Sequence, residues 1–88
     1  MYRLRYTPEA IKDIKKLDTV TRKRLDKKLR YFASQEDPLR LAKPLVDYHD
    51  ARFRYRVGMY RILFDLEGES IIVLRVDKRS DIYRMFMF

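Results

Sequence analysis

The sequence contains no cysteine and only one histidine, His49. Without cysteine the chain has neither a disulfide framework nor a thiolate metal site, and one histidine cannot anchor a zinc or iron ion alone. We therefore expect no structural or catalytic transition metal and no cofactor.

Long apolar runs are also absent. The N-terminus, MYRLRYTPEA, has arginine at its third and fifth positions, and no segment of the chain is apolar over the length of a signal peptide or a membrane span. No linker, repeat or low-complexity tract divides the 88 residues. These features predict one cytoplasmic domain, residues 1–88, with no membrane partner.

Acidic residues are the minority among the charges, with 13 Asp and Glu against 21 Lys and Arg, a formal net charge of +8. Because 47% of the residues are hydrophobic, the chain is expected to fold rather than remain disordered. A basic globular protein of this size indicates a polyanionic partner, most commonly a nucleic acid.

The first half of the chain has the pattern of one strand and two helices. Residues 1–6 alternate and predict a strand, and Thr7-Pro8 is a helix start signal for a helix over residues 8–17. Asp18-Thr19 begins a second helix, with apolar residues at i, i+4 and i+7: Leu25, Leu29 and Phe32. Two helices with so short a connection predict an αα-hairpin.

The second half has the pattern of strands. Residues 53–57 and 60–66 alternate, residues 71–76 are nearly all apolar, and residues 82–88 are rich in aromatics and methionine. The predicted fold is α+β, with an antiparallel sheet of three to five strands covered on one face by the helices. The predicted order is β-α-α-β-β-β, with one further strand at the C-terminus.

The segment RFRYRVGMYR, residues 52–61, carries four arginines and no acidic residue. Gly58-Met59 predicts a two-residue hairpin turn of type II′, which makes residues whose numbers add up to 117 face one another. One sheet face is then apolar: Phe53, Tyr55, Val57, Tyr60, Ile62, Phe64 and Leu66. The other carries Leu63, Asp65 and four arginines, Arg52, Arg54, Arg56 and Arg61; we call it the arginine face and expect it not to be part of a core.

The arginine face places Arg56 directly opposite Arg61, and like charges in that position cost a fraction of about 1 kcal/mol. An anion between the two guanidinium groups would explain the arrangement, because arginine matches phosphate oxygens bidentately. Arg52 faces Asp65, so an ion pair is as good an interpretation as ligand contact. Lys27 and the other basic residues of the helices indicate either RNA contact or an ordinary solvated helix surface.

The order of elements, the segment RFRYRVGMYRILF and the later VDKRSDIY together resemble the RelE/ParE superfamily of toxin–antitoxin toxins, in particular its RelE ribonuclease branch. The resemblance implies an endoribonuclease that cleaves mRNA in the ribosomal A site and is inhibited by a cognate antitoxin. By position, it implies active-site roles for Arg52, Arg54, Arg61, Arg79 and Tyr83. Met59 stands where the branch commonly has Asp, and Lys78 where many members have His.

RNA cleavage without a metal needs a base, an acid and cations that stabilise the transition state. Arginine supplies only the cations, because its pKa is above 12. The candidates for proton transfer are Lys78, Tyr83 and His49, with Asp47 or Asp50 as a carboxylate alternative. Two other functions stay open: inhibition of DNA gyrase, as in the ParE branch, and RNA binding without catalysis.

Overall fold

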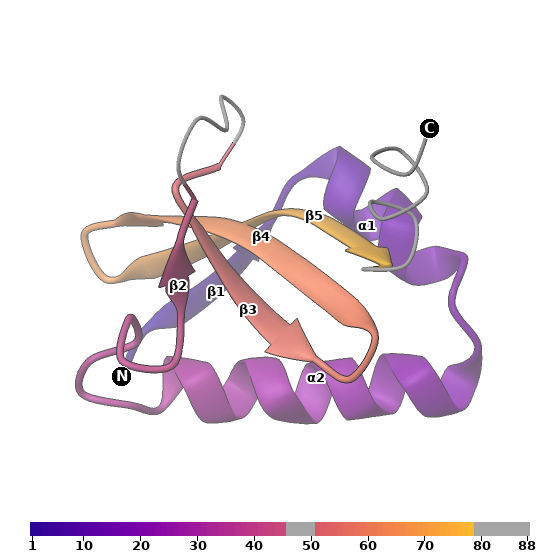
Figure 1. Cartoon of the computed structure of the whole chain (residues 1–88), viewed down its shortest axis with the longest axis horizontal. Coiled ribbons are helices and arrows are strands. Elements are labelled where there is room, and N and C mark those ends of the chain that lie inside the picture. The colour runs from indigo at the N-terminus through magenta and orange to yellow at the C-terminus, as the bar shows by residue number, and fades with distance from the viewer. Residues whose placement is uncertain (46–50, 79–88) are drawn as a thin grey trace.

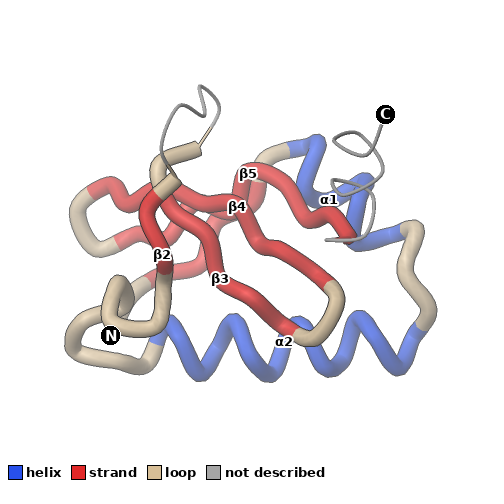
Figure 2. Tube along the Cα trace, viewed as in Figure 1, coloured by secondary structure: helices blue, strands red, loops and turns tan. Residues whose placement is uncertain are grey.

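The structure, a computed structural model, describes residues 1–45 and 51–78. Its elements follow in the order β1 (Arg3–Tyr6), α1 (Pro8–Lys15), α2 (Thr19–Ala33), β2 (Lys43–Pro44), β3 (Phe53–Val57), β4 (Tyr60–Glu67) and β5 (Ser70–Lys78). Figures 1 and 2 show the strands gathered in one sheet, with α2 extending along the molecule beneath the β3–β4 hairpin. The α+β class is confirmed.

The strands lie in the order β1-β5-β4-β3-β2. Three neighbouring pairs, β2–β3, β3–β4 and β4–β5, are antiparallel, whereas β1 is parallel to β5. The sheet is therefore mixed at the β1 edge, where the sequence predicted antiparallel pairing throughout. The reason is that β1 and β5 are not consecutive, so no short turn dictates their direction.

The first helix begins as the sequence predicts. Thr7 is its N-cap, and the Thr7 hydroxyl accepts a hydrogen bond from the Ala10 N–H at 3.1 Å. The same hydroxyl donates to the Leu74 carbonyl of β5 at 2.8 Å, so the start of α1 is tied to the sheet. The second helix begins after Asp18, which has the extended backbone of an N-cap residue.

The core lies between the helices and the apolar face of the sheet. Leu25, Leu29 and Phe32 of α2 are buried, as their spacing predicts. The Phe32 and Tyr55 rings stack with centroids 3.9 Å apart, and Tyr55 stacks on Phe64 at 4.1 Å. The Tyr55 hydroxyl donates to the Pro38 carbonyl, and burial raises its pKa.

The sheet has five described strands because the short strand β2 adds to its edge, where Lys43 and Pro44 pair with β3. The sequence predicted a connection here, because two residues that include a proline carry no strand periodicity. The further strand predicted over residues 82–88 lies outside the described residues. Among the described residues, no helix is long and apolar enough to cross a membrane.

Candidate nucleic-acid interface on the open face of the sheet

The β3–β4 hairpin has the predicted register. Arg56 pairs with Arg61, Arg54 with Leu63 and Val57 with Tyr60. Gly58 has a φ of 59°, the left-handed value that the turn requires of its first central residue. The predicted division of the hairpin into an apolar and an arginine face is therefore confirmed, but Leu63, on the arginine face, is fully buried, where the sequence predicted no core.

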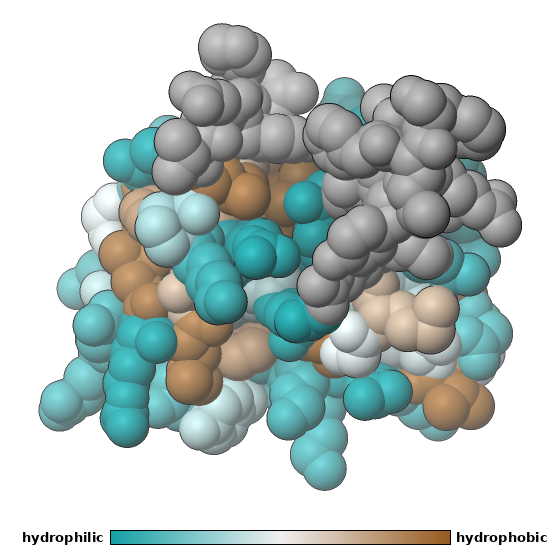
Figure 3. All heavy atoms as spheres, viewed as in Figure 1, coloured by the Kyte–Doolittle hydropathy of each residue, from teal (hydrophilic) through white to brown (hydrophobic). Residues whose placement is uncertain are grey.

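The arginine face is part of a larger basic surface on the side of the sheet away from the helices. Pairing and alternation place on this side the basic residues Arg3, Arg5, Lys43, Arg52, Arg54, Arg56, Arg61 and Arg75, and the acidic residues Asp65, Glu67 and Asp77. Figure 3 shows hydrophilic side chains gathered at the centre of the view. The excess of basic side chains favours an anionic partner for this face.

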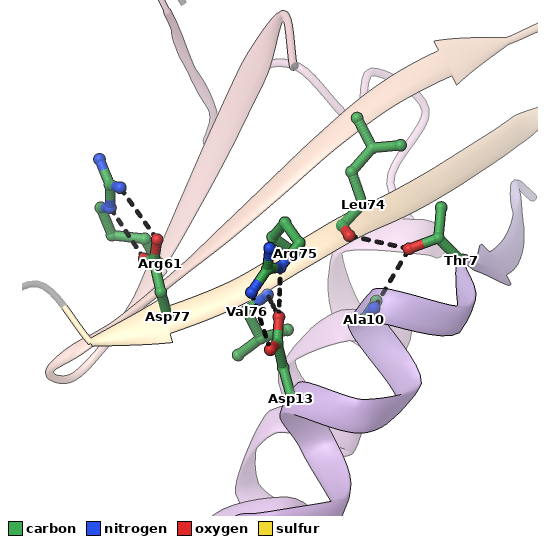
Figure 4. Close-up of polar contacts among 8 residues, drawn as sticks. All are labelled: Thr7, Ala10, Asp13, Arg61, Leu74, Arg75, Val76 and Asp77. Carbon is green, nitrogen blue, oxygen red and sulfur yellow. Dashed lines mark hydrogen bonds and ion pairs between the residues drawn. The ribbon is translucent and has the colours of Figure 1, made fainter.

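Arg61 is held by a carboxylate of the neighbouring strand (Figure 4). Its Nε and Nη2 donate to Oδ1 and Oδ2 of Asp77, each at 3.1 Å, in a bidentate ion pair. The exposed fractions of the two side chains are 12% and 33%, so water screens the pair only in part. Asp77 thus supplies the negative charge next to Arg61 that the sequence led us to expect from a phosphate.

A β-bulge places Asp77 opposite Arg61. Near the Gly68-Glu69 turn, β4 and β5 pair as Glu67 with Ser70, and this register would put Val76 opposite Arg61. The register shifts at Leu63/Phe64, so that Arg61 faces Asp77 instead. The same shift lets Val73 and Val76, three residues apart, both point into the core.

Of the two interpretations that the sequence left open for Arg52, the structure shows the ion pair with Asp65. Its backbone N–H donates to Asp65 Oδ1 at 2.7 Å, and its Nε lies 3.6 Å from the same oxygen. Its Nη2 also donates to the Leu66 carbonyl at 2.7 Å. These contacts direct the Arg52 guanidinium toward β4, away from a role as a free cation.

Arg54 and Arg56 differ from Arg52 and Arg61 in having no carboxylate partner among residues 1–45 and 51–78. Arg56 is exposed and Arg54 is half-buried. No hydrogen bond from either guanidinium group to another described residue is found, so within the described structure their N–H donors are available for an oxyanion. Within the arginine face, these two residues have the strongest claim to a phosphate.

The structure does not bring Lys78 to the arginine face. Lys78 pairs with Tyr60, one position beyond the Arg61–Asp77 pair, so its side chain points to the opposite side of the sheet. Its ammonium nitrogen lies 5.9 Å from the centroid of the Tyr60 ring. Lys78 lines a cleft with Lys16 and Tyr60 between α1 and the end of β5.

Lys27 is likewise separate from the arginine face. It is exposed on α2, two positions from buried Leu25 and Leu29, and therefore points away from the sheet. The remaining site candidates, Arg79, Tyr83, His49, Asp47 and Asp50, lie outside the described residues.

A polar contact that the sequence analysis missed joins α1 to the bulged part of β5. Asp13 accepts hydrogen bonds from Arg75 Nε at 2.8 Å, Arg75 Nη2 at 3.2 Å and the Val76 N–H at 3.0 Å. Burial opposes ionisation of Asp13, but the hydrogen bonds from Arg75 and Val76 outweigh it, so the pKa of Asp13 is lowered. The partners are 62 and 63 residues away, and no local pattern marks them.

Carboxylates elsewhere in the described part of the chain do not converge. No group of three or more His, Cys, Asp or Glu side chains there is placed to hold a metal ion. The chemistry that the described open face supports is therefore the binding of an anion by guanidinium groups.

A comparison with known protein families shows to which family the chain belongs. The model described as ParE toxin of type II toxin–antitoxin system, parDE, matches residues 4–83. The chain belongs to this family. The resemblance to the RelE/ParE superfamily is thereby confirmed.

The relatives of this toxin carry RelE-type names. It is 36% identical over 88 residues to Toxin RelG of Mycobacterium tuberculosis, covering 94% of this chain and 97% of RelG. Its structure matches the RelB-RelE antitoxin-toxin complex from Methanococcus jannaschii with a TM-score of 0.65 and 31% identity, over 93% of this chain and 98% of that one. It matches the toxin-antitoxin complex RelBE2 of Mycobacterium tuberculosis with a TM-score of 0.65 and 32% identity, over 89% and 98%. The chain is a toxin of the RelBE type.

Proposed function

We propose that this toxin is a metal-independent, ribosome-dependent endoribonuclease that acts in the cytoplasm and cleaves mRNA in the A site. The observation that carries the proposal is which arginines of the arginine face form ion pairs and which do not. Arg54 and Arg56 have no carboxylate among the described residues, and they stand beside Arg61, which Asp77 holds in place. A surface of fixed and free guanidinium groups suits the charge that develops on a phosphate during cleavage.

The proposed reaction is attack of a 2′-oxygen on the adjacent phosphorus. The O–P bond to the 2′-oxygen forms, and the bond to the departing 5′-oxygen breaks. Arg54 and Arg56 bind the non-bridging oxygens. Arg61 adds its Nη1, which makes no hydrogen bond to a described residue, while Nε and Nη2 stay on Asp77. Asp77 is then a positioning residue for Arg61.

Proton transfer is assigned to groups other than these arginines, because an arginine keeps its proton at neutral pH. Arg79 and Tyr83 follow β5 in the sequence and complete the set that the family resemblance suggests. Lys78, Tyr83 and His49 are the candidates for the base. Lys78 is the one whose position is described, and it requires a changed side-chain direction to reach the arginine face.

The proposed partners are a cognate antitoxin, the ribosome with its mRNA, and no small-molecule cofactor. The antitoxin is suggested by the similarity to RelB-RelE antitoxin-toxin complexes. The whole chain, residues 1–88, is proposed to act as one domain, since both helices and the sheet share one core.

The test is cleavage of a defined mRNA on programmed ribosomes, followed by mapping of the new 5′ ends. We expect cuts within the A-site codon, and we expect Arg56→Gln to lower the cleavage rate by about 10²-fold, as for the loss of one transition-state donor. Arg22→Gln is the matched control, because Arg22 is an exposed arginine of α2 that lines the groove between α1 and α2, apart from the arginine face. It should leave the rate nearly unchanged.

Two outcomes would replace the proposal. Intact mRNA together with DNA breaks trapped on gyrase would assign the toxin to gyrase inhibition, the alternative that the resemblance to the ParE branch suggests. Intact mRNA with RNA binding alone would make the chain a basic RNA-binding protein without catalysis.

A further inference from the structure

Arg24 of α2 lies against the turn of the arginine hairpin. A Cβ atom built on Gly58 would lie 3.3 Å from Arg24 Nη2, 3.4 Å from Nη1 and 3.5 Å from Cζ. The guanidinium group therefore packs over the turn, in space that glycine leaves open. Figure 1 shows the β3–β4 turn reaching α2, so the end of the arginine face and the helix meet here.

The guanidinium of Arg24 has no carboxylate to pair with on its own helix. Side chains three and four positions away are neighbours on a helix, and for Arg24 these are Val20, Thr21, Lys27 and Lys28. The nearest acidic residue of α2, Asp26, pairs with Arg30 at 3.0 Å. Among residues 1–45 and 51–78, Arg24 makes no ion pair.

The described lining of the groove around Arg24 also contains no acidic residue. It has a volume of 240 Å³ and is lined by Thr21, Arg24, Leu25, Val57, Met59 and Tyr60. Arg24 itself is exposed to solvent. A guanidinium that is packed on one side and open on the other is a prepared anion site, because part of its ordering cost is already met in the free protein.

The position of this site relates it to the arginine face. Arg56 precedes Gly58 by two residues, which corresponds to roughly 7 Å along a strand. The turn leads from Arg54 and Arg56, on the open side of the sheet, toward Lys27 and Lys28 on α2. Arg24 is thus the cation between two basic surfaces that otherwise face away from each other.

We propose that Arg24 binds a backbone phosphate of the RNA strand next to the phosphate held by Arg54 and Arg56, and so extends the RNA path around the hairpin turn onto α2. This inference rests on the proposed function for the identity of the strand. RNA is the occupant favoured by the site, because the described lining of the groove offers the Arg24 cation, the Tyr60 ring and the Thr21 hydroxyl, without a base-specific set of donors and acceptors.

The test measures binding of a fluorescent single-stranded oligoribonucleotide to the full-length chain over a range of salt concentrations. One lost phosphate contact reduces the slope of log K against log salt by roughly 0.7 for a single strand. Arg24→Gln is expected to show this reduction, and Arg24→Lys, which keeps the charge, is expected to retain the slope. Arg22→Gln is the matched control, because Arg22 lines the groove between α1 and α2 instead.

The inference is overturned if Arg24→Gln and Arg22→Gln change the slope equally, since only net charge would then matter. It is also overturned if the wild-type chain does not bind RNA, or if Arg24→Gln weakens antitoxin binding and leaves RNA binding unchanged. Thermal melting checks that Arg24→Gln is folded. If it is not, Arg24→Met replaces it, because methionine keeps an apolar stem over the turn and removes the charge, and an unchanged slope in that folded variant overturns the inference. RNA binding with the expected slopes but no cleavage on ribosomes would refute the proposed function and leave Arg24 as an RNA contact.

Discussion

Arg61 differs from the other residues of its face because two of its three nitrogens are already engaged by a carboxylate. Its side chain is 12% exposed and that of Asp77 is 33% exposed. Removing the carboxylate leaves a nearly buried guanidinium directly opposite Arg56, whereas removing the guanidinium leaves a carboxylate that water reaches. Loss of the Asp77 carboxylate should therefore destabilise the fold more than loss of the Arg61 guanidinium.

We expect Asp77→Asn to lower the free energy of unfolding by about 1–3 kcal/mol, the usual range for a lost hydrogen bond to a charged group. Arg61→Met keeps the apolar stem and removes the charge that opposes Arg56, so it should lose clearly less. Urea denaturation of both variants and of the double variant gives the coupling energy between the two side chains. An equal or larger loss in Arg61→Met would show that Arg56 and Arg61 do not repel each other here.

At the scale of elements, α1 contacts the bulged part of β5 along the edge of the strand that β1 leaves unpaired. The pairing of β1 with β5 ends at Val73. Past this point the Leu74 carbonyl accepts a hydrogen bond from the hydroxyl of Thr7, the N-cap of α1, and the Val76 N–H donates to Asp13 of α1. The bulge in turn sets the register that places Asp77 opposite Arg61. The helix therefore helps to fix the arginine face, although its own hydrogen bonds to the sheet go to β5.

This arrangement predicts a pH-dependent role for Asp13. Its pKa is lower in the folded chain than in the unfolded chain, so its stabilisation is full above the unfolded value of about 4 and is lost as pH falls through the folded value. We expect Asp13→Asn to lose roughly 1–3 kcal/mol at pH 7. The difference from the wild type should shrink below about pH 4, where the Asp13 carboxyl of the unfolded chain takes up a proton while that of the folded chain is still ionised.

Asp26→Asn provides the control for this prediction, because the Asp26–Arg30 pair joins exposed side chains within α2. Such a pair contributes only about 0.3–0.5 kcal/mol. Chemical denaturation at pH 7 and pH 3 measures both variants, and hydrogen exchange of the Val76 N–H reports the local contact. A loss in Asp13→Asn that stays constant between these pH values would contradict the ionised hydrogen bonds.

The elements also show which parts of the structure the sequence predicts. The β3–β4 register follows from Gly58 and from alternation on both sides of a two-residue turn, and both signals are local. The β1–β5 pairing and the Asp13–Arg75 contact join distant residues, and the Arg61–Asp77 pair depends on a bulge that breaks alternation. One trace of the bulge is present in the sequence, since Val73 and Val76 cannot both face the core in a regular strand.

At the scale of the whole molecule, the residues that supply positive charge are not the ones that could transfer a proton. The described open face supplies guanidinium groups suited to binding a phosphate, but its described arginines do not accept a proton at neutral pH. Cleavage is fast only when the RNA strand is held close to the in-line geometry of 2′-oxygen attack, so the rate depends on the partner that holds the RNA. The ribosome is the proposed source of that geometry.

We therefore expect the toxin to bind a naked mRNA fragment but to cleave it at least about 10²-fold more slowly than the same sequence in the A site of a programmed ribosome, because positioning contributes factors of this size or larger. Single-turnover rates with both substrates at saturating toxin make the comparison independent of affinity. The Arg56→Gln variant should slow both reactions, since the phosphate contact is needed in either setting. Equal rates on naked and ribosome-bound RNA would mean that the chain carries its own efficient base, and the search for that base would move to Lys78, Tyr83 and His49.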